Sequence, residues 1–131
     1  MNIENNKGAA LVEMAIILPL LLLIVFGIFE FGRAMVITNS LTNAAREGAR
    51  QAAVSPPPIN VDEFVRSAIP FPFEASELII TPEPLSPTPG SGSPVKITVT
   101  LPFHTVTQLI PLLDGKILRG EASMRYEYAG P

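Results

Sequence analysis

The sequence contains no cysteine. This absence excludes disulfide bonds, a lipid-modified cysteine anchor, cysteine-ligated zinc and a cysteine nucleophile. The region from residue 55 to residue 131 therefore has to hold itself together by packing alone, which gives only marginal stability at this size. We expect this region to gain stability by docking onto a helix or onto neighbouring molecules.

Residue patterns typical of enzymes are also scarce. The sequence has a single histidine, His104, no pair of carboxylates at a motif spacing, no glycine-rich phosphate loop and no Gly-x-Ser-x-Gly elbow. We expect His104 to lie on the surface or in a loop. The sequence thus predicts a protein that is not an enzyme, with no catalytic residue, no cofactor and no metal.

Basic surface is the third feature that the chain lacks. Residues 1–54 balance four Lys/Arg against four Glu, and residues 55–131 hold five Lys/Arg against eight acidic residues. A mildly acidic surface without a basic stripe gives no electrostatic attraction for phosphate backbones. We expect no nucleic-acid partner.

Apolar residues, in contrast, are concentrated near the N-terminus. Met14 to Phe29 carries no charged or polar side chain, and extension back to Gly8 gives 22 residues interrupted only by Glu13. At about 1.5 Å per helical residue this stretch spans roughly the hydrocarbon core of a bilayer. Residues 9–29 are therefore predicted to be a transmembrane helix. Pro19 lies within it and predicts a kink or a locally melted turn.

The helix is predicted to continue beyond the membrane, from about Ala9 to Ala53, until three consecutive prolines end it after Ser55. Residues 30–54 form an amphipathic stem in this prediction, with small and apolar residues repeating at three and four on one face. That face is expected to be Phe31, Ala34, Thr38, Leu41, Ala45, Gly48 and Ala52. The other face is expected to be Ser40, Asn43, Glu47 and Arg50. Ala45, Ala49 and Ala53 form a row of small residues that permits close approach of a partner helix or sheet.

The proline-rich region 55–131 holds thirteen of the fourteen prolines. Its composition predicts a flexible loop at residues 81–94. The sequence predicts a short helix at Val61–Ala68, capped by Asn60 with Glu63 at the capping-box position. Alternating apolar residues predict strands near Glu77–Thr81, Val95–Leu101 and Glu121–Tyr128. The fold class expected is α+β: a long N-terminal helix with an antiparallel sheet of about three strands packed on its C-terminal half.

Three segments carry a resemblance to a known family. Gly8-Ala9-Ala10-Leu11-Val12-Glu13 before the apolar run is similar to the processing signal of type IV prepilins. Phe31-Gly32-Arg33 and the segment NAAREGAR at residues 43–50 resemble the TadE-like family of the tight-adherence (Tad/Flp) pilus system. The alternating segment that ends in Met124-Arg125-Tyr126-Glu127 is compatible with the C-terminal end of that family.

The resemblance implies a pilin-like minor pilin or pseudopilin that acts in filament biogenesis and adhesion. Residues 1–8 would be a leader, cut after Gly8 by a prepilin peptidase to free the amine of Ala9. Glu13 would set the register of subunits by meeting that amine. The stem motif would comprise Gly32, Arg33, Arg46, Glu47, Gly48 and Arg50. Family relatives often have an acidic residue close before the Gly-Arg pair. Here Glu30 lies two positions before Gly32, where it can still pair with Arg33 at i, i+3.

The partners expected from this resemblance are the lipid bilayer, a prepilin peptidase and other pilin subunits, in a homo- or hetero-oligomer. The expected location is the inner membrane, or a surface filament, with a single span and an extracytoplasmic C-terminus. The distribution of basic residues argues the other way, since Arg33, Arg46 and Arg50 follow the span and only Lys7 precedes it. The resemblance decides our prediction, because a proline-rich acidic domain has no evident cytoplasmic task.

Two further interpretations remain open at this level. The N-terminal segment can be an uncleaved anchor, or an ordinary secretory signal, for an envelope binding module. A signal peptidase would need a small-x-small site soon after the apolar run, and none follows closely. A transporter accessory subunit or sensor stalk fits the helix equally well but leaves Gly8 and the segment at residues 43–50 unexplained.

Overall fold

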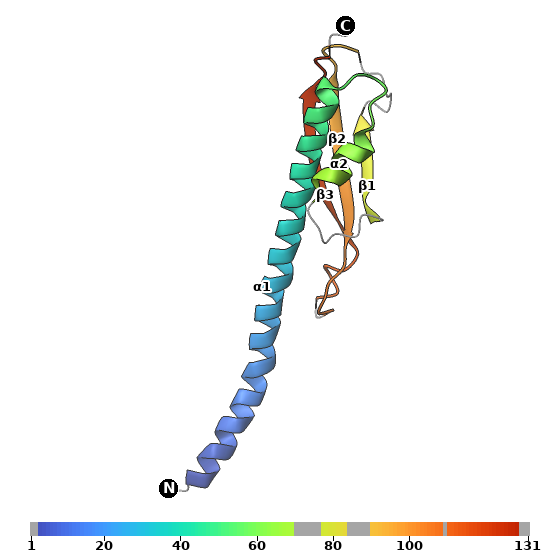
Figure 1. The fold of residues 1–131 in the computed structure, drawn as a ribbon. Coiled ribbons are helices and arrows are strands. Elements are labelled where there is room, and N and C mark those ends of the chain that lie inside the picture. The colour runs from blue at the N-terminus through green and yellow to red at the C-terminus, as the bar shows by residue number, and fades with distance from the viewer. Residues whose placement is uncertain (1–2, 70–76, 84–89, 109, 129–131) are drawn as a thin grey trace.

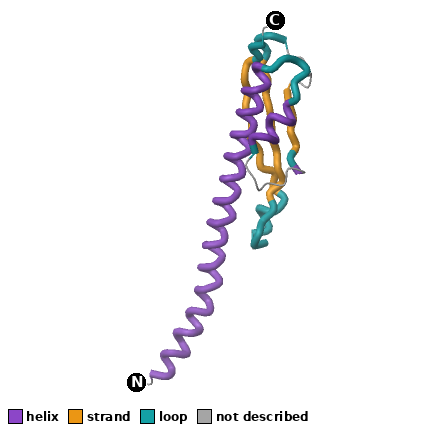
Figure 2. Tube along the Cα trace, in the orientation of Figure 1, coloured by secondary structure: helices purple, strands orange, loops and turns teal. Residues whose placement is uncertain are grey.

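The computed structural model describes residues 3–69, 77–83, 90–108 and 110–128, and shows one long helix with a small sheet beside its C-terminal half (Figures 1 and 2). The elements, in chain order, are α1 (Ile3–Val54), α2 (Val61–Ala68), β1 (Ile79–Glu83), β2 (Pro94–Phe103) and β3 (Lys116–Arg125). The predicted α+β class, with three antiparallel strands packed on the helix, is confirmed.

Helix α1 is longer than predicted. It begins at Ile3 rather than at about Ala9, so the backbone of residues 3–8 is helical. The helix is continuous through Pro19, and the predicted locally melted turn is absent. Figure 1 instead shows gentle curvature in the N-terminal part. Proline removes one backbone donor, and a long helix absorbs this loss by bending.

The sheet has the order β1-β2-β3, with both pairs antiparallel. Ile79 pairs with Thr100 across β1 and β2, and Phe103 pairs with Lys116 where β2 turns into β3. The strands differ in bounds from those predicted: β1 runs on to Glu83, β2 begins at Pro94, and β3 begins at Lys116. The predicted flexible loop at residues 81–94 is therefore shorter, because its two ends, Thr81–Glu83 and Pro94, belong to strands. Residues 84–89 of that loop lie outside the described residues.

The core lies between the stem and one face of the sheet. Val95, Ile97, Val99 and Leu101 are buried, as their alternation predicted. On the stem, the buried apolar or small residues are Ile37, Leu41, Ala44, Ala45, Gly48, Ala49, Ala52 and Ala53. Phe31 was predicted on this face and is instead 61% exposed, because the covered stripe drifts to Glu30 and Ile37 toward the N-terminus. Met124 of β3 is 37% exposed.

Two glycines bring the layers together. A Cβ atom built on Gly120 of β3 would lie 2.3 Å from the backbone N of Thr42, so β3 lies directly on the α1 backbone there. A Cβ atom on Gly48 would lie 2.5 Å from Cγ2 of Val65 in α2. Glycine is required at Gly120, because the neighbouring atoms there are backbone. At Gly48 the nearest atom is a methyl group of Val65, which a larger side chain would have to displace. The small residues of the stem therefore allow close packing on two sides.

The short helix and the chain end complete the fold. Asn60 caps α2 by accepting a hydrogen bond from the backbone N–H of Glu63, at 3.4 Å, as predicted. Strand β3 stops at Arg125 rather than at Tyr128, because the chain then turns onto the end of α1. There the Glu127 N–H donates to Ala53 O at 2.9 Å, and the Tyr126 hydroxyl donates to Ser55 O at 3.1 Å. These bonds satisfy carbonyls at the C-terminal end of α1 that the helix itself leaves unpaired.

Candidate functional site

The predicted processing residues lie on an isolated part of α1. Gly8, Ala9 and Glu13 are exposed, and a Cβ atom on Gly8 would have no neighbour within 4 Å. Ala9 and Glu13 are four residues apart on a continuous helix and therefore share one face. Nothing described in the chain packs on them, so the backbone at Gly8 and the Glu13 carboxylate are accessible to another molecule.

The apolar segment that follows is also uncovered. The described residues contain one helix long and apolar enough to cross a membrane, and its apolar window has no residue buried within the protein. Large apolar side chains from Leu11 to Phe29 are 43% to 72% exposed, except for Phe26, which is half-buried. An apolar surface of this length has to be covered by something outside the chain, and lipid is the cover that length and composition fit.

The predicted stem motif divides into separate environments. Gly48 is buried in the helix–helix contact with Val65. Glu47 and Arg50 form an exposed ion pair at 2.6 Å, and hydrogen bonds from Arg50 and Gln51 lower the pKa of Glu47 to about 2. Arg46 and Gly32 are exposed, with nothing near Gly32. These residues thus do not converge on one site: Gly48 packs against α2, whereas Arg33 bonds to the β2–β3 loop.

Arg33 joins a cluster built around Glu30, which we call the Glu30 cluster: Glu30, Arg33, Phe103, His104, Val106 and Thr107. Glu30 directly follows the apolar segment, and its side chain is fully buried. Its Oε1 atom accepts hydrogen bonds from the backbone N–H of Val106 at 2.8 Å and of Thr107 at 2.9 Å. The Thr107 hydroxyl donates to the same oxygen at 3.1 Å. The β2–β3 loop, residues 104–115, is thus tied to α1 at the point where the apolar segment ends.

Arg33 closes the other side of this cluster. Its Nη2 atom lies 3.4 Å from Oε2 of Glu30, which confirms the i, i+3 pairing allowed by the sequence. The same atom donates a hydrogen bond to the carbonyl of His104. The guanidinium carbon lies 4.6 Å from the centroid of the Phe103 ring, a cation–π geometry. One arginine therefore links the helix to the last residue of β2 and the first of the loop.

The electrostatics of Glu30 favour its ionised form. Burial by itself raises the pKa of this carboxyl, but the hydrogen bonds from Thr107 and Val106 and the charge of Arg33 outweigh burial. The net effect is a pKa of Glu30 below its usual value. All three donors bond to Oε1, whereas Oε2 accepts no hydrogen bond from the described residues and faces the charge of Arg33 at 3.4 Å, so the partners replace the lost hydration mainly on one oxygen. The cluster joins the β2–β3 loop to α1.

His104 is exposed in the loop, as predicted. Its Nε2 atom lies 3.5 Å from Oε2 of Glu77, and its Nδ1 atom lies 3.9 Å from Oδ1 of Asp114. Across residues 3–69, 77–83, 90–108 and 110–128, no group of three or more His, Asp or Glu side chains has the spacing to hold a metal ion.

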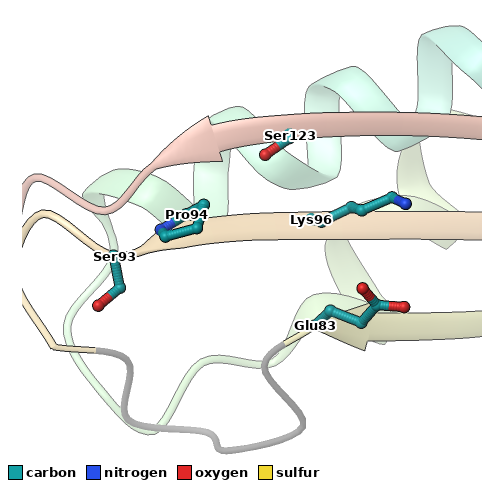
Figure 3. A pocket seen from close by; sticks show the side chains of 5 residues that line it. All are labelled: Glu83, Ser93, Pro94, Lys96 and Ser123. Carbon is teal, nitrogen blue, oxygen red and sulfur yellow. The ribbon is translucent and has the colours of Figure 1, made fainter.

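A hollow of about 530 Å³ lies on the sheet and is lined by Glu83, Ser93, Pro94, Lys96 and Ser123 (Figure 3). Lys96 is paired in register with Glu83 on one side and Ser123 on the other, so these side chains share the face turned away from the core. Lys96 Nζ lies 3.5 Å from Oε2 of Glu121. The hollow is thus part of the solvent-facing side of the sheet, and we assign it no function.

Sequence reasoning missed the burial of Glu30 and the place of the β2–β3 loop. Glu30 had one sequence signal, its spacing from Arg33, but the partners at residues 106 and 107 are more than seventy positions away. The loop also had one sequence signal, which is the apolar run Ile110-Pro111-Leu112-Leu113 in a region otherwise rich in turns. Neither signal reveals that the two segments meet.

Comparison with known proteins identifies one family. Residues 8–50 match the family model described as TadE-like protein, which confirms the resemblance over the segment where the motifs lie. The match begins at the predicted processing residue and ends at Arg50, and therefore covers the exposed span and most of the stem. No curated protein and no solved structure matches the chain. Proteins of this family are structural components of the Tad pilus and are not known as enzymes.

Proposed function

Because residues 8–50 match the TadE-like family, we propose that this protein is a minor pilin or pseudopilin-like structural subunit of a Tad/Flp-type pilus assembly system. Residues 9–29 anchor it in the inner membrane, and the stem with its sheet stands outside the lipid. A prepilin peptidase removes residues 1–8, and the subunit then joins other pilin subunits in filament biogenesis and adhesion.

The observation that carries this proposal is the division of α1 into two parts with opposite packing. The part within residues 9–29 is apolar and exposed, apart from partial cover at Phe26 and Gly27, whereas the stem buries its small residues against the sheet. A helix that is covered only at one end is suited to inserting its free end among other apolar helices or lipids. The exposed Gly8 and Glu13 lie at that free end, where a peptidase and a neighbouring amine can reach them.

The proposed orientation places the C-terminus outside the cytoplasm. Arg33, Arg46 and Arg50 follow the span and would favour the opposite orientation. Arg33 is paired with Glu30 and Arg50 with Glu47, carboxylates of the same helix, whereas Arg46 is exposed. A C-terminal reporter that is active only outside the cytoplasm should give signal, and a silent reporter would reverse the orientation.

Filament formation tests the proposed function. In cells that depend on this gene for Tad-type pili, Gly8→Leu should abolish both cleavage and piliation, because the peptidase needs the small residue before the cut. Glu13→Leu should leave cleavage intact and impair assembly, because the register contact is lost. Ile16→Leu is the matched control, since it changes an exposed apolar residue of the same helix.

The two variants separate the proposal from an uncleaved anchor. An envelope binding module that uses this helix only as an anchor would tolerate Gly8→Leu and Glu13→Leu equally. Normal piliation in both variants would therefore exclude the pilin-like role.

A further inference from the structure

The β2–β3 loop presents apolar side chains beyond the end of the sheet. Figure 1 shows this loop extending from β2 and β3 alongside α1 toward the N-terminal half of the helix. Val106 is 67% exposed and Leu112 is 76% exposed. The rest of the sheet domain turns its large apolar residues mainly toward the core, so the loop is a place where apolar surface is offered outward.

A contact with α1 fixes the level of this loop along the helix. A Cβ atom built on Gly27 would lie 3.4 Å from Cδ1 of Ile110, which places Ile110 directly against the helix at that residue. Gly27 lies inside the segment proposed to span the membrane and precedes Glu30 by three positions, about 4.5 Å along a helix. The headgroup region on each side of a bilayer is roughly 5 to 7 Å thick. The loop therefore reaches the depth of the outer lipid region when residues 9–29 span the bilayer.

Several backbone N–H groups of the loop are hydrogen-bonded within the protein. The N–H of Leu113 donates to Ile110 O at 3.1 Å, and the N–H of Asp114 donates to Pro111 O at 3.3 Å. Pro111 has no N–H to satisfy. The carboxylate of Glu30 takes the N–H groups of Val106 and Thr107. Backbone groups that enter lipid have to be paired within the protein, and these four N–H groups are. The N–H groups of Ile110 and Leu112 have no partner among the described residues, which fits the hydrated headgroup boundary rather than the hydrocarbon core.

We infer that the β2–β3 loop is a second membrane contact, in which Val106, Ile110 and Leu112 enter the boundary between headgroups and acyl chains beside the emerging helix. The inference rests on the membrane anchoring by residues 9–29 that forms part of the proposed function. Lipid is the occupant because the apolar surface of the loop is continuous, through Ile110 and Gly27, with the exposed surface of the span.

A second contact has a mechanical consequence. A single transmembrane helix is free to tilt and rotate, and anchors at the interface restrict both motions. The Glu30 cluster joins the loop rigidly to α1, so contact of the loop with the membrane fixes which side of the stem faces the lipid surface. The sheet is thereby held at one orientation before the subunit enters an assembly.

The experiment uses the absence of tryptophan from the sequence, which makes any introduced tryptophan a sole reporter. The full chain carrying Leu112→Trp is reconstituted into phosphatidylcholine/phosphatidylglycerol vesicles whose acyl chains are brominated either near the headgroup or near the bilayer centre. Val54→Trp, at the far end of the stem, is the exposed control, and Leu21→Trp is the control within the span. Val106→Trp repeats the test on the other side of the loop.

The inference predicts that Leu112→Trp and Val106→Trp emit at shorter wavelength than Val54→Trp. Bromines near the headgroup should remove most of their emission, and Leu21→Trp should be quenched more by the deep bromines. If Leu21→Trp is quenched but both loop reporters behave like Val54→Trp, the loop contact is wrong and the anchoring stands. Loop reporters with short-wavelength emission but no quenching are covered by protein, such as a second copy, which also overturns the inference. An unquenched Leu21→Trp contradicts the anchoring itself.

Discussion

Removal of the Glu30 carboxylate should release the β2–β3 loop from α1. In Glu30→Ala, the backbone N–H groups of Val106 and Thr107 lose their acceptor, and Arg33 loses its anionic partner. A hydrogen bond to a charged group contributes about 1.5 to 3 kcal/mol, which gives about 3 to 6 kcal/mol for the two N–H groups. Arg33 is 32% exposed, so water partly replaces its lost partner and the ion pair adds little to this sum. We therefore expect the opening free energy of the loop to fall by about 3 kcal/mol or more.

Amide hydrogen exchange of the full chain in detergent micelles measures this opening. Val106 is an exposed residue, so its amide is protected mainly through the bond to Glu30, and a loss of about 3 kcal/mol accelerates its exchange about a hundred-fold. Glu30→Gln retains an acceptor oxygen and should accelerate exchange less. Glu47→Ala removes an exposed carboxylate and should leave the loop unchanged. Wild-type protection of Val106 and Thr107 in Glu30→Ala would refute the role given to this carboxylate.

Three further predictions concern the stem and the short helix. Gly48→Ala should lower the melting temperature, because overpacking against α2 costs about 1 to 3 kcal/mol. Gly32→Ala is the control: a Cβ atom there has nothing within 4 Å, so the change should stabilise the helix by up to about 1 kcal/mol. Equal melting temperatures of the two variants would contradict the close packing at Gly48. Ionised Glu47 has a folded pKa of about 2, below the usual 4.5, so its contribution is present above pH 4.5 and is lost as the pH falls from 4.5 to 2. Glu47→Gln should flatten that part of the thermal-unfolding profile, and an unchanged profile would show that the pair with Arg50 is unimportant. Asn60→Ala should cost about 1 kcal/mol by uncapping α2, and a melting temperature equal to wild type would contradict the cap.

The sequence predicted most of what depends on short-range periodicity. The bounds of α2, its cap at Asn60, the buried alternation of β2 and the small-residue row of the stem all follow from local patterns that the structure confirms. The predicted covered face of the stem was wrong at Phe31, because the position of the sheet, rather than hydrophobicity, decides which residues of the stem are covered. At this level of α1, the partner is the β2–β3 loop, which takes Glu30 and leaves Phe31 exposed.

Long-range contacts set the limit of sequence reasoning here. The packing of Gly120 on the α1 backbone and the bonds from Glu30 to the loop both join segments more than seventy residues apart. No periodicity encodes such pairings, since either residue taken alone is compatible with many environments. The position of Glu30 directly after the apolar segment suggests a charge at the membrane surface, and only its partners in the structure show that it is buried. The processing residues were identified by resemblance rather than by physics, because an exposed Gly-Ala pair on a helix carries no chemical signal of its own.

The intact mass of the protein purified from cells that contain a prepilin peptidase tests the central claim most directly. The account predicts a mature chain that lacks residues 1–8 and begins with AALVEM, so that Ala9 carries the free amine and Glu13 lies four residues beyond it. The same protein from cells without the peptidase should retain its full length. A chain that keeps residues 1–8 in the presence of the peptidase, or is cut far from Gly8, would contradict the pilin-like role and leave α1 as a simple membrane anchor.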